Sequence, residues 1–246
     1  MSLLAIDAGN TRVKWARDEA GTWVDTGAMA TRALLEGTAP PGPGGNVDAL
    51  IICNVAGAEA ARRLLDWASA SGVPAQLAAS RARACGVFNG YRDPAQLGTD
   101  RWAALIGAHG NPRYGRGAKL VVLAGTALTV DVLHGDGVFA GGIIAPGPEL
   151  MRTALNRGTA QLPLTAGEPV DFPAGTAEAI DTGVIDACAG AIGRVGERLR
   201  AHSGVWPFVV ACGGAAAAIV RALPFEATIN DNLVFDGLRA LACAGD

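Results

Sequence analysis

Charged, cysteine and aromatic residues are all scarce in this sequence. Charged residues make up 17% and aromatic residues 5% of the 246 positions, and the cysteines number only five. No two cysteines lie at the spacing of a metal site, so neither a disulfide framework nor a zinc site is indicated. No run of Lys or Arg exceeds two residues, and the net charge is −3. We therefore expect no nucleic-acid partner, because proteins that follow a phosphate backbone normally carry a basic stripe.

Long apolar segments are absent as well. The N-terminus reaches Asp7 before the core of a signal peptide could form. The longest apolar stretch, 208–220, is interrupted by Gly213 and Gly214 and is too short to cross a bilayer. We expect a cytoplasmic protein with no membrane partner. Hydrophobic residues make up 50% of the chain, which argues against disorder and allows a large core.

Glycine is abundant, with 34 residues, about twice its ordinary share of ~7%. Apolar runs and alternation predict strands, and helical spacing predicts helices. The expected strands are 3–8, 11–17, 22–30, 49–54, 119–132 with an interruption at its small residues, 138–146 and 208–212. The expected helices are 59–71, 101–109 capped by Thr99 or Asp100, 149–156, 176–202 with a break near Gly190, 215–223 and 232–244. Residues 38–46 are expected to form a Pro/Gly loop.

The two halves of the chain follow a similar plan. Each opens with a pair of strands around a small-residue turn and continues through hairpin strands to helices. We expect a duplicated α/β unit with halves 1–112 and 113–246. Ligands would bind in a central cleft between the halves.

Two turns carry candidate phosphate-binding residues. In the first, Gly9 lets the backbone approach a ligand, Asp7 could hold a hydrated Mg²⁺, and Lys14 suits a phosphate. An ordinary hairpin turn explains these residues equally well. The second, 125–131, offers threonine hydroxyls and small residues, although a plain sheet core also explains it.

Two further segments carry candidate nucleotide and acid–base chemistry. Gly213 and Gly214 stand at a strand-to-helix junction, where a nucleotide could lie on the backbone. At the start of the expected helix, Asp100 could accept a proton and Arg101 could grip a carboxylate. The alternative is a capping Asp beside a surface Arg. The GxxxxGK[ST] loop is absent from the sequence, which excludes a P-loop.

Taken in order, these segments resemble the motifs of type III pantothenate kinases, a family of the acetate and sugar kinase/Hsc70/actin superfamily. The resemblance covers nearly the whole chain and rests on seven segments: 7–14, 91–103, 125–131, 141–147, 151–155, 176–183 and 212–214. It implies a duplicated actin-like ATPase fold with ribonuclease H-like halves. It also implies ATP-dependent phosphorylation of pantothenate to 4′-phosphopantothenate, the first step of coenzyme A biosynthesis.

The resemblance assigns roles to individual residues. Asp100 would be the general base, and pantothenate would be bound by Tyr91, Gly98, Thr99 and Arg101. ATP would be bound by Asp7, Ala8, Gly9, Asn10, Thr11, Arg12, Val13, Lys14, Gly125, Thr126, Ala127, Gly213 and Gly214, with Asp7 facing Mg²⁺ through water. The family is homodimeric, and Thr176 would reach the substrate of the neighbouring subunit.

Leu123 and Cys212 depart from the family pattern, and two other functions stay open. Leu123 stands where the family commonly has an Asp that helps to bind an activating K⁺ or NH₄⁺, so we expect weaker activation by these cations. One alternative is a non-catalytic regulatory protein, because some relatives are described as Bvg accessory factors. Another is a different sugar or acetate kinase on the same fold. The presence of Asp7, Asp100 and Arg101 favours an enzyme, because a protein that only binds a ligand needs no general base beside a residue that binds a carboxylate.

Overall fold

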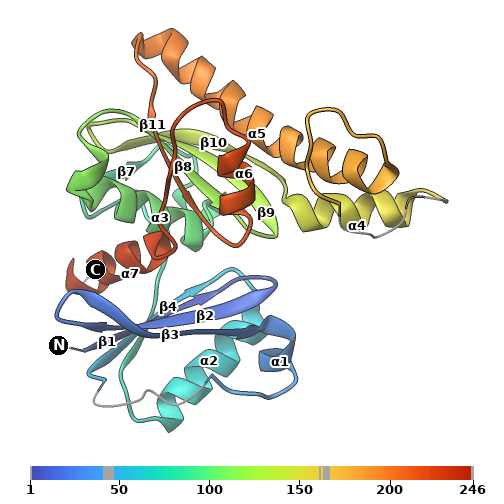
Figure 1. Ribbon diagram of the computed structural model, residues 1–246. Helices are drawn as coiled ribbons and strands as arrows, with labels where there is room; N and C mark the ends of the chain where they lie inside the picture. Colours follow the sequence, from blue (N-terminus) through green and yellow to red (C-terminus); the bar gives the residue numbers. More distant parts are fainter. Residues whose placement is uncertain (1, 41–46, 161, 163–166, 245–246) are drawn as a thin grey trace. The chain divides into compact units, whose positions relative to one another are not determined.

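The computed structural model describes residues 2–40, 47–160, 162 and 167–244. They form two compact units: the first is built from the described residues of 1–113, 136–139 and 232–246, and the second from those of 114–135 and 140–231. Each unit combines a β-sheet with helices (Figure 1). The expected loop at 38–46 lies mostly outside the described residues.

The first unit contains a five-stranded sheet in the order β3-β2-β1-β4-β5. Its strands are β1 (Leu3–Ala8), β2 (Arg12–Glu19), β3 (Thr22–Ala30), β4 (Ala49–Asn54) and β5 (Ala75–Leu77). Strand β1 pairs antiparallel with β2 and parallel with β4. Leu4 and Ile6 of β1 belong to the core that packs on helices α1 (Thr31–Leu35) and α2 (Ala58–Ala70). Because side chains alternate along a strand, Asp7 lies on the opposite face of the sheet.

Helices α3 (Thr99–Gly110) and α7 (Leu233–Ala244) pack closely on each other in the first unit. Two glycines permit this approach. A Cβ on Gly237 would lie 1.8 Å from the carbonyl oxygen of Ala103, and one on Gly107 would lie 2.3 Å from that of Leu233. The C-terminal helix, which we expected in the second half, therefore groups with the first unit. The 3₁₀ turns at Pro94–Gln96 and Pro112–Tyr114 and the short strands β6 (Arg83–Ala84) and β7 (Val87–Asn89) complete the elements around α3.

The second unit repeats the strand arrangement of the first. Strands β8 (Lys119–Ala124), β9 (Ala127–Leu133), β10 (Val138–Pro146), β11 (Phe208–Cys212) and β12 (Thr228–Ile229) follow the order β10-β9-β8-β11-β12. Strand β8 pairs antiparallel with β9 and parallel with β11, as β1 does with β2 and β4. Strand β10 begins in the first unit, where Val138 and Phe139 pair in parallel with β7. The order β3-β2-β1-β4-β5 is thus reproduced, which confirms the expected duplication.

Helix α5 (Thr176–Ser203) supplies most of the helical cover of the second sheet, with α6 (Ala216–Arg221) beside it and α4 (Pro148–Gly158) packed on α5. Ile185, Ile192 and Leu199 of α5 are buried in one core with residues of β8, β9 and β11. The expected break near Gly190 is wrong, because the helix is continuous. Glycine inside a helix costs about 1 kcal/mol, which burial of this apolar face outweighs. Among the described residues, no helix has both the length and the apolar character that a membrane span requires.

Candidate active site

The turn between β1 and β2 is held by backbone bonds and by the start of α1. The amide of Gly9 donates to the carbonyl oxygen of Arg12 at 3.0 Å, and the Thr31 hydroxyl donates to the carbonyl oxygen of Gly9 at 2.6 Å. Asn10 and Thr11 are exposed at its tip, as is Arg12. The turn thus presents backbone and polar side chains, as expected for a phosphate motif. Ala8 and Val13 are fully buried in the core, so only their main chain can contribute to a site.

Asp7, at the end of β1, has a carboxyl group whose charged form is disfavoured. Its pKa is raised from 3.8 to about 6, first by burial and then by the charge of Asp100, while Lys14 and a hydrogen bond from Cys53 act in the opposite direction. Lys14 is its register partner on β2. Among the described residues, Asp7 Oδ1 is buried and has no hydrogen-bond partner. A carboxylate oxygen left in this way fits a cation or a cation-bound water.

Asp100 lies in the first turn of α3. Its Oδ1 accepts a hydrogen bond from the backbone amide of Arg101 at 2.8 Å. Burial raises the pKa of Asp100, and that hydrogen bond together with the charge of Arg101 limits the rise. A Cβ on Gly98 would lie 2.6 Å from Asp100 Oδ1, so a larger residue at this position would displace the carboxylate. The expected cap by Thr99 or Asp100 is wrong, because Gly98 is the N-cap residue and makes no side-chain cap.

The Thr99 hydroxyl points to strand β4. Its Oγ1 lies 3.2 Å from Cys53 Sγ and donates to the carbonyl oxygen of Asn54 at 3.3 Å. Cys53 is fully buried, and burial raises the pKa of its thiol well above the usual value. The thiol is therefore protonated and can donate a hydrogen bond.

Arg101 is only 4% exposed and is surrounded by aromatic rings. Its Nη1 donates to the Tyr91 hydroxyl at 3.0 Å. The guanidinium carbon lies 5.6 Å from the centre of the Tyr91 ring and 5.9 Å from that of Phe139, and the two rings are 5.2 Å apart. Phe139 was not predicted, because its position depends on the pairing of β10 with β7, which no local pattern reveals. The cluster is a cation fixed in an apolar wall, which suits a small carboxylate ligand.

The second unit brings two of the predicted motifs together. Gly125 and Thr126 are exposed between β8 and β9, where the Gly125 amide donates to the Ala127 carbonyl oxygen at 3.0 Å. The amide of Gly147 donates to the Thr126 carbonyl oxygen at 2.9 Å, and a Cβ on Gly147 would lie 2.1 Å from the carbonyl oxygen of Gly125. Glycine at 147 is therefore required for this turn.

Gly213 and Gly214 follow β11, which is the neighbour of β8. Gly213 has φ +113°, and a Cβ on it would lie 2.5 Å from the carbonyl oxygen of Ala124. The Ala215 amide donates to the same oxygen at 3.1 Å. The glycine pair therefore lies directly beside the strand that leads into the Gly125 turn.

Leu123 and Thr176 occupy different parts of the second unit. Leu123 lies between Thr129 of β9 and Cys212 of β11 in the strand register. The Thr129 hydroxyl is buried and has no hydrogen-bond partner among the described residues. Leu123, Thr129 and Cys212 together therefore offer one side-chain oxygen and no carboxylate. Thr176 is the first residue of α5 and is exposed.

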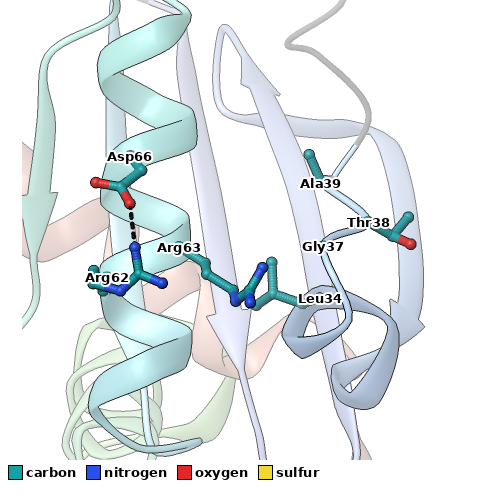
Figure 2. A pocket seen from close by; sticks show the side chains of 7 residues that line it. All are labelled: Leu34, Gly37, Thr38, Ala39, Arg62, Arg63 and Asp66. Atoms are coloured by element: carbon teal, nitrogen blue, oxygen red, sulfur yellow. Dashed lines mark hydrogen bonds and ion pairs between the residues drawn. The ribbon is translucent and has the colours of Figure 1, made fainter.

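A hollow on the first unit lies apart from the predicted residues. It is lined by Leu34, Gly37, Thr38, Ala39, Arg62, Arg63 and Asp66, from α1, α2 and the segment after α1 (Figure 2). Arg62 bonds to Asp66 at 2.8 Å, and both arginines bond to Glu59. Their charges are thus matched locally, which leaves little attraction for an anion. Within the described ranges, no three His, Cys, Asp or Glu residues gather into a group that could hold a metal ion.

The chain matches known proteins over nearly all of its length. The family model described as "Type III pantothenate kinase" matches residues 3–198. Proteins named type III pantothenate kinase from Aromatoleum aromaticum and Dechloromonas aromatica are 43% and 39% identical to it, and each alignment covers 98% of this chain and at least 97% of the relative.

Solved structures support the same fold. A Campylobacter jejuni protein described as a Baf family transcriptional activator gives a TM-score of 0.62 at 18% identity, with 98% of both chains covered. A Listeria monocytogenes protein described as an N-acetylmannosamine kinase gives 0.51 at 12% identity over both full chains. These likenesses show the actin-like, duplicated two-sheet fold. With the family model and the sequence relatives, they establish that this chain belongs to the type III pantothenate kinase family.

Proposed function

We propose that this chain transfers the terminal phosphate of ATP to the hydroxyl of pantothenate, forming 4′-phosphopantothenate in the cytoplasm. Family membership supports the reaction. The single observation that carries it is the adjacency of Asp100, a carboxylate with a raised pKa, and Arg101, a buried cation with an aromatic wall. The first turn of α3 thus places a general base beside a side chain that can bind a carboxylate.

Asp100 accepts the proton of the pantothenate hydroxyl as that oxygen attacks phosphorus. A general base works best when its pKa lies near the working pH, and burial moves Asp100 in that direction. Arg101 binds the pantothenate carboxylate through its planar fork, and the Tyr91 hydroxyl fixes the orientation of the guanidinium. Gly98 leaves the space that the Asp100 carboxylate needs.

Asp7 is the residue that would hold Mg²⁺ through water, and its unpartnered oxygen and the repulsion from Asp100 fit that role. A bound Mg²⁺ neutralises charge on the transferring phosphate. Lys14, Asn10 and Thr11 contact phosphate oxygens in the first unit. In the second unit, Gly125, Thr126 and Ala127 contribute a phosphate-binding turn, and Gly213 and Gly214 accept the adenosine side.

The protein acts as a homodimer in which Thr176 contacts the substrate of the neighbouring subunit. Its exposed position at the start of α5 supports this role. Activation by K⁺ or NH₄⁺ is weak, because Leu123 supplies no oxygen and the Thr129 hydroxyl alone is a poor cation site.

A coupled assay tests the function directly. ADP release by the purified protein should depend on added pantothenate, and the product should be 4′-phosphopantothenate by mass spectrometry. If ADP release appeared only with another hydroxyl acceptor, the chain would be a different kinase. If neither pantothenate nor sugars nor acetate stimulated ADP release, a regulatory role would replace the enzyme.

A further inference from the structure

The thiol of Cys53 touches two elements that carry the acidic groups of the site. On β4, Cys53 is the register partner of Asp7 on β1, so the two side chains share one face of the sheet. The Cys53 thiol also lowers the pKa of the Asp7 carboxyl, and so favours its charged form. The thiol donates its single proton to Thr99 Oγ1, at an Sγ–Oγ1 distance of 3.2 Å, and Thr99 directly precedes Asp100.

We propose that Cys53 is a positioning residue that fixes the spacing between the Asp7 carboxylate and the Asp100 carboxylate, because it joins the first residue of α3 to β4 at the position that pairs with Asp7 of β1. The proposal rests on the proposed kinase function. It does not make Cys53 a catalytic residue, because the residue is fully buried.

The first turn of α3 explains why such a link is needed. Gly98 is the N-cap residue and provides no side-chain cap, so the ordinary anchor of a helix start is missing. The Thr99 hydroxyl replaces it with bonds to β4, through Cys53 Sγ and the Asn54 carbonyl oxygen. An error of about 1 Å in the placement of reacting groups can cost about 100-fold in rate. A loose first turn would therefore lower turnover without removing any group that binds ATP.

Three single variants and one double variant test the link. Cys53→Ala should lower kcat about 10- to 100-fold while KM for ATP changes little. Cys53→Ser keeps a hydroxyl that can donate and accept, and should recover most of the lost kcat. Thr99→Val should reproduce the loss, and the double variant Cys53→Ala/Thr99→Val should lose no more than the worse single variant, because both changes break one link.

Cys188→Ala is the matched control. Cys188 is also fully buried, but it lies in the core of the second unit with residues of α5 and β8. It should lower the stability to urea about as much as Cys53→Ala does, yet keep the wild-type kcat. If both alanine variants lost kcat equally, the effect would be general destabilisation and the positioning role would be refuted. A Cys53→Ala variant with wild-type kcat, or additive losses in the double variant, would refute it as well.

Amide hydrogen exchange tests the positioning role of Cys53 independently of the proposed kinase function. Amides at 98–103 should exchange faster in Cys53→Ala than in the wild type or Cys53→Ser, and this comparison needs no substrate. A wild type without pantothenate-dependent ADP release would refute the kinase function alone. Unchanged exchange at 98–103 in Cys53→Ala would refute the link whether or not the protein is a kinase.

Discussion

At the scale of single residues, Asp7 and Asp100 of the first unit have different surroundings. Burial raises the pKa of both, but the amide and the charge of Arg101 limit the rise for Asp100. Asp7 has a buried oxygen that has no hydrogen-bond partner among the described residues. We therefore expect Asp100 to act as the base and Asp7 to favour a bound cation.

Asp100→Asn should lower kcat by about 10²- to 10⁴-fold, because the amide cannot accept the hydroxyl proton. The amide oxygen can still accept the bond from the Arg101 backbone, so the helix start and pantothenate binding should persist. Steady-state kinetics and calorimetric titration with pantothenate measure the two effects. A variant that kept half of the wild-type kcat would show that another group takes the proton.

Arg101→Lys should raise KM for pantothenate more than KM for ATP. Lysine keeps the charge but loses the planar fork and its contacts with the Tyr91 and Phe139 rings. Initial rates over a grid of both substrates distinguish the two constants. A rise in KM for ATP alone would place Arg101 on the nucleotide side.

Asp7 should make the cation-free protein less stable as pH rises. The folded-state pKa of about 6 exceeds the unfolded value near 3.8, so the folded chain binds an extra proton between about pH 4 and 6. The free energy of unfolding should therefore fall across this window by at most about 3 kcal/mol, with the full loss present at pH 7 and above.

Urea unfolding of the wild type and Asp7→Asn at pH 5 and pH 7.5 measures this dependence. The difference between the two proteins isolates Asp7 from other carboxyl groups. Asp7→Asn should remove the fall in stability and be inactive, and Mg²⁺ with a nucleotide should restore stability to the wild type at pH 7.5. Equal pH dependence in both proteins would mean that folding does not raise the pKa of Asp7.

At the scale of elements, the sequence predicted the strands of five or more residues and the helices of six or more. Strands β1, β3, β4, β10 and β11 lie where alternation and apolar runs placed them. Helix α1 and strands β5, β6, β7 and β12 were missed, because elements of two to five residues form through pairing with distant segments rather than through local pattern.

The site was predictable to a similar extent. The order of motifs identified Asp7, Asp100 and Arg101, and the structure places all three in the first unit with Tyr91. Phe139 and the Cys53–Thr99 contact could not be predicted, since both depend on which elements pack against α3 and β7. The packing of α7 on α3 was missed for the same reason.

Gly237→Ala should destabilise the contact between α3 and α7. Its Cβ would overlap the Ala103 carbonyl oxygen, a backbone atom that cannot move aside without shifting a helix. A loss of about 1–3 kcal/mol in the free energy of unfolding is expected from such overpacking. Gly110→Ala, at the end of α3 with open space around it, is the control and should stay within about 0.5 kcal/mol of the wild type. Equal stability of the two variants would mean that the helices can separate freely.

At the scale of the whole molecule, both subunits contribute to each of the two substrate sites in the proposed dimer. Helix α5 carries small residues along a face that the core does not use: Ala187 and Gly190 are exposed, and Gly193 is half-buried. Small residues allow close approach of a second helix, so we expect sedimentation to show a dimer rather than a 25 kDa monomer.

Mixing two inactive variants tests whether that dimer completes the site. Thr176→Trp should block the site of the neighbouring subunit, and Asp100→Asn should inactivate the site of the subunit that carries it. In a mixed dimer, the Asp100 of one subunit meets the Thr176 of the other, so one of the two sites is intact. Equal amounts, exchanged after mild dissociation, should recover about a quarter of the wild-type rate, since about half of the dimers are mixed. No recovery, with mixed dimers shown by native mass spectrometry, would mean that each subunit binds pantothenate without its partner.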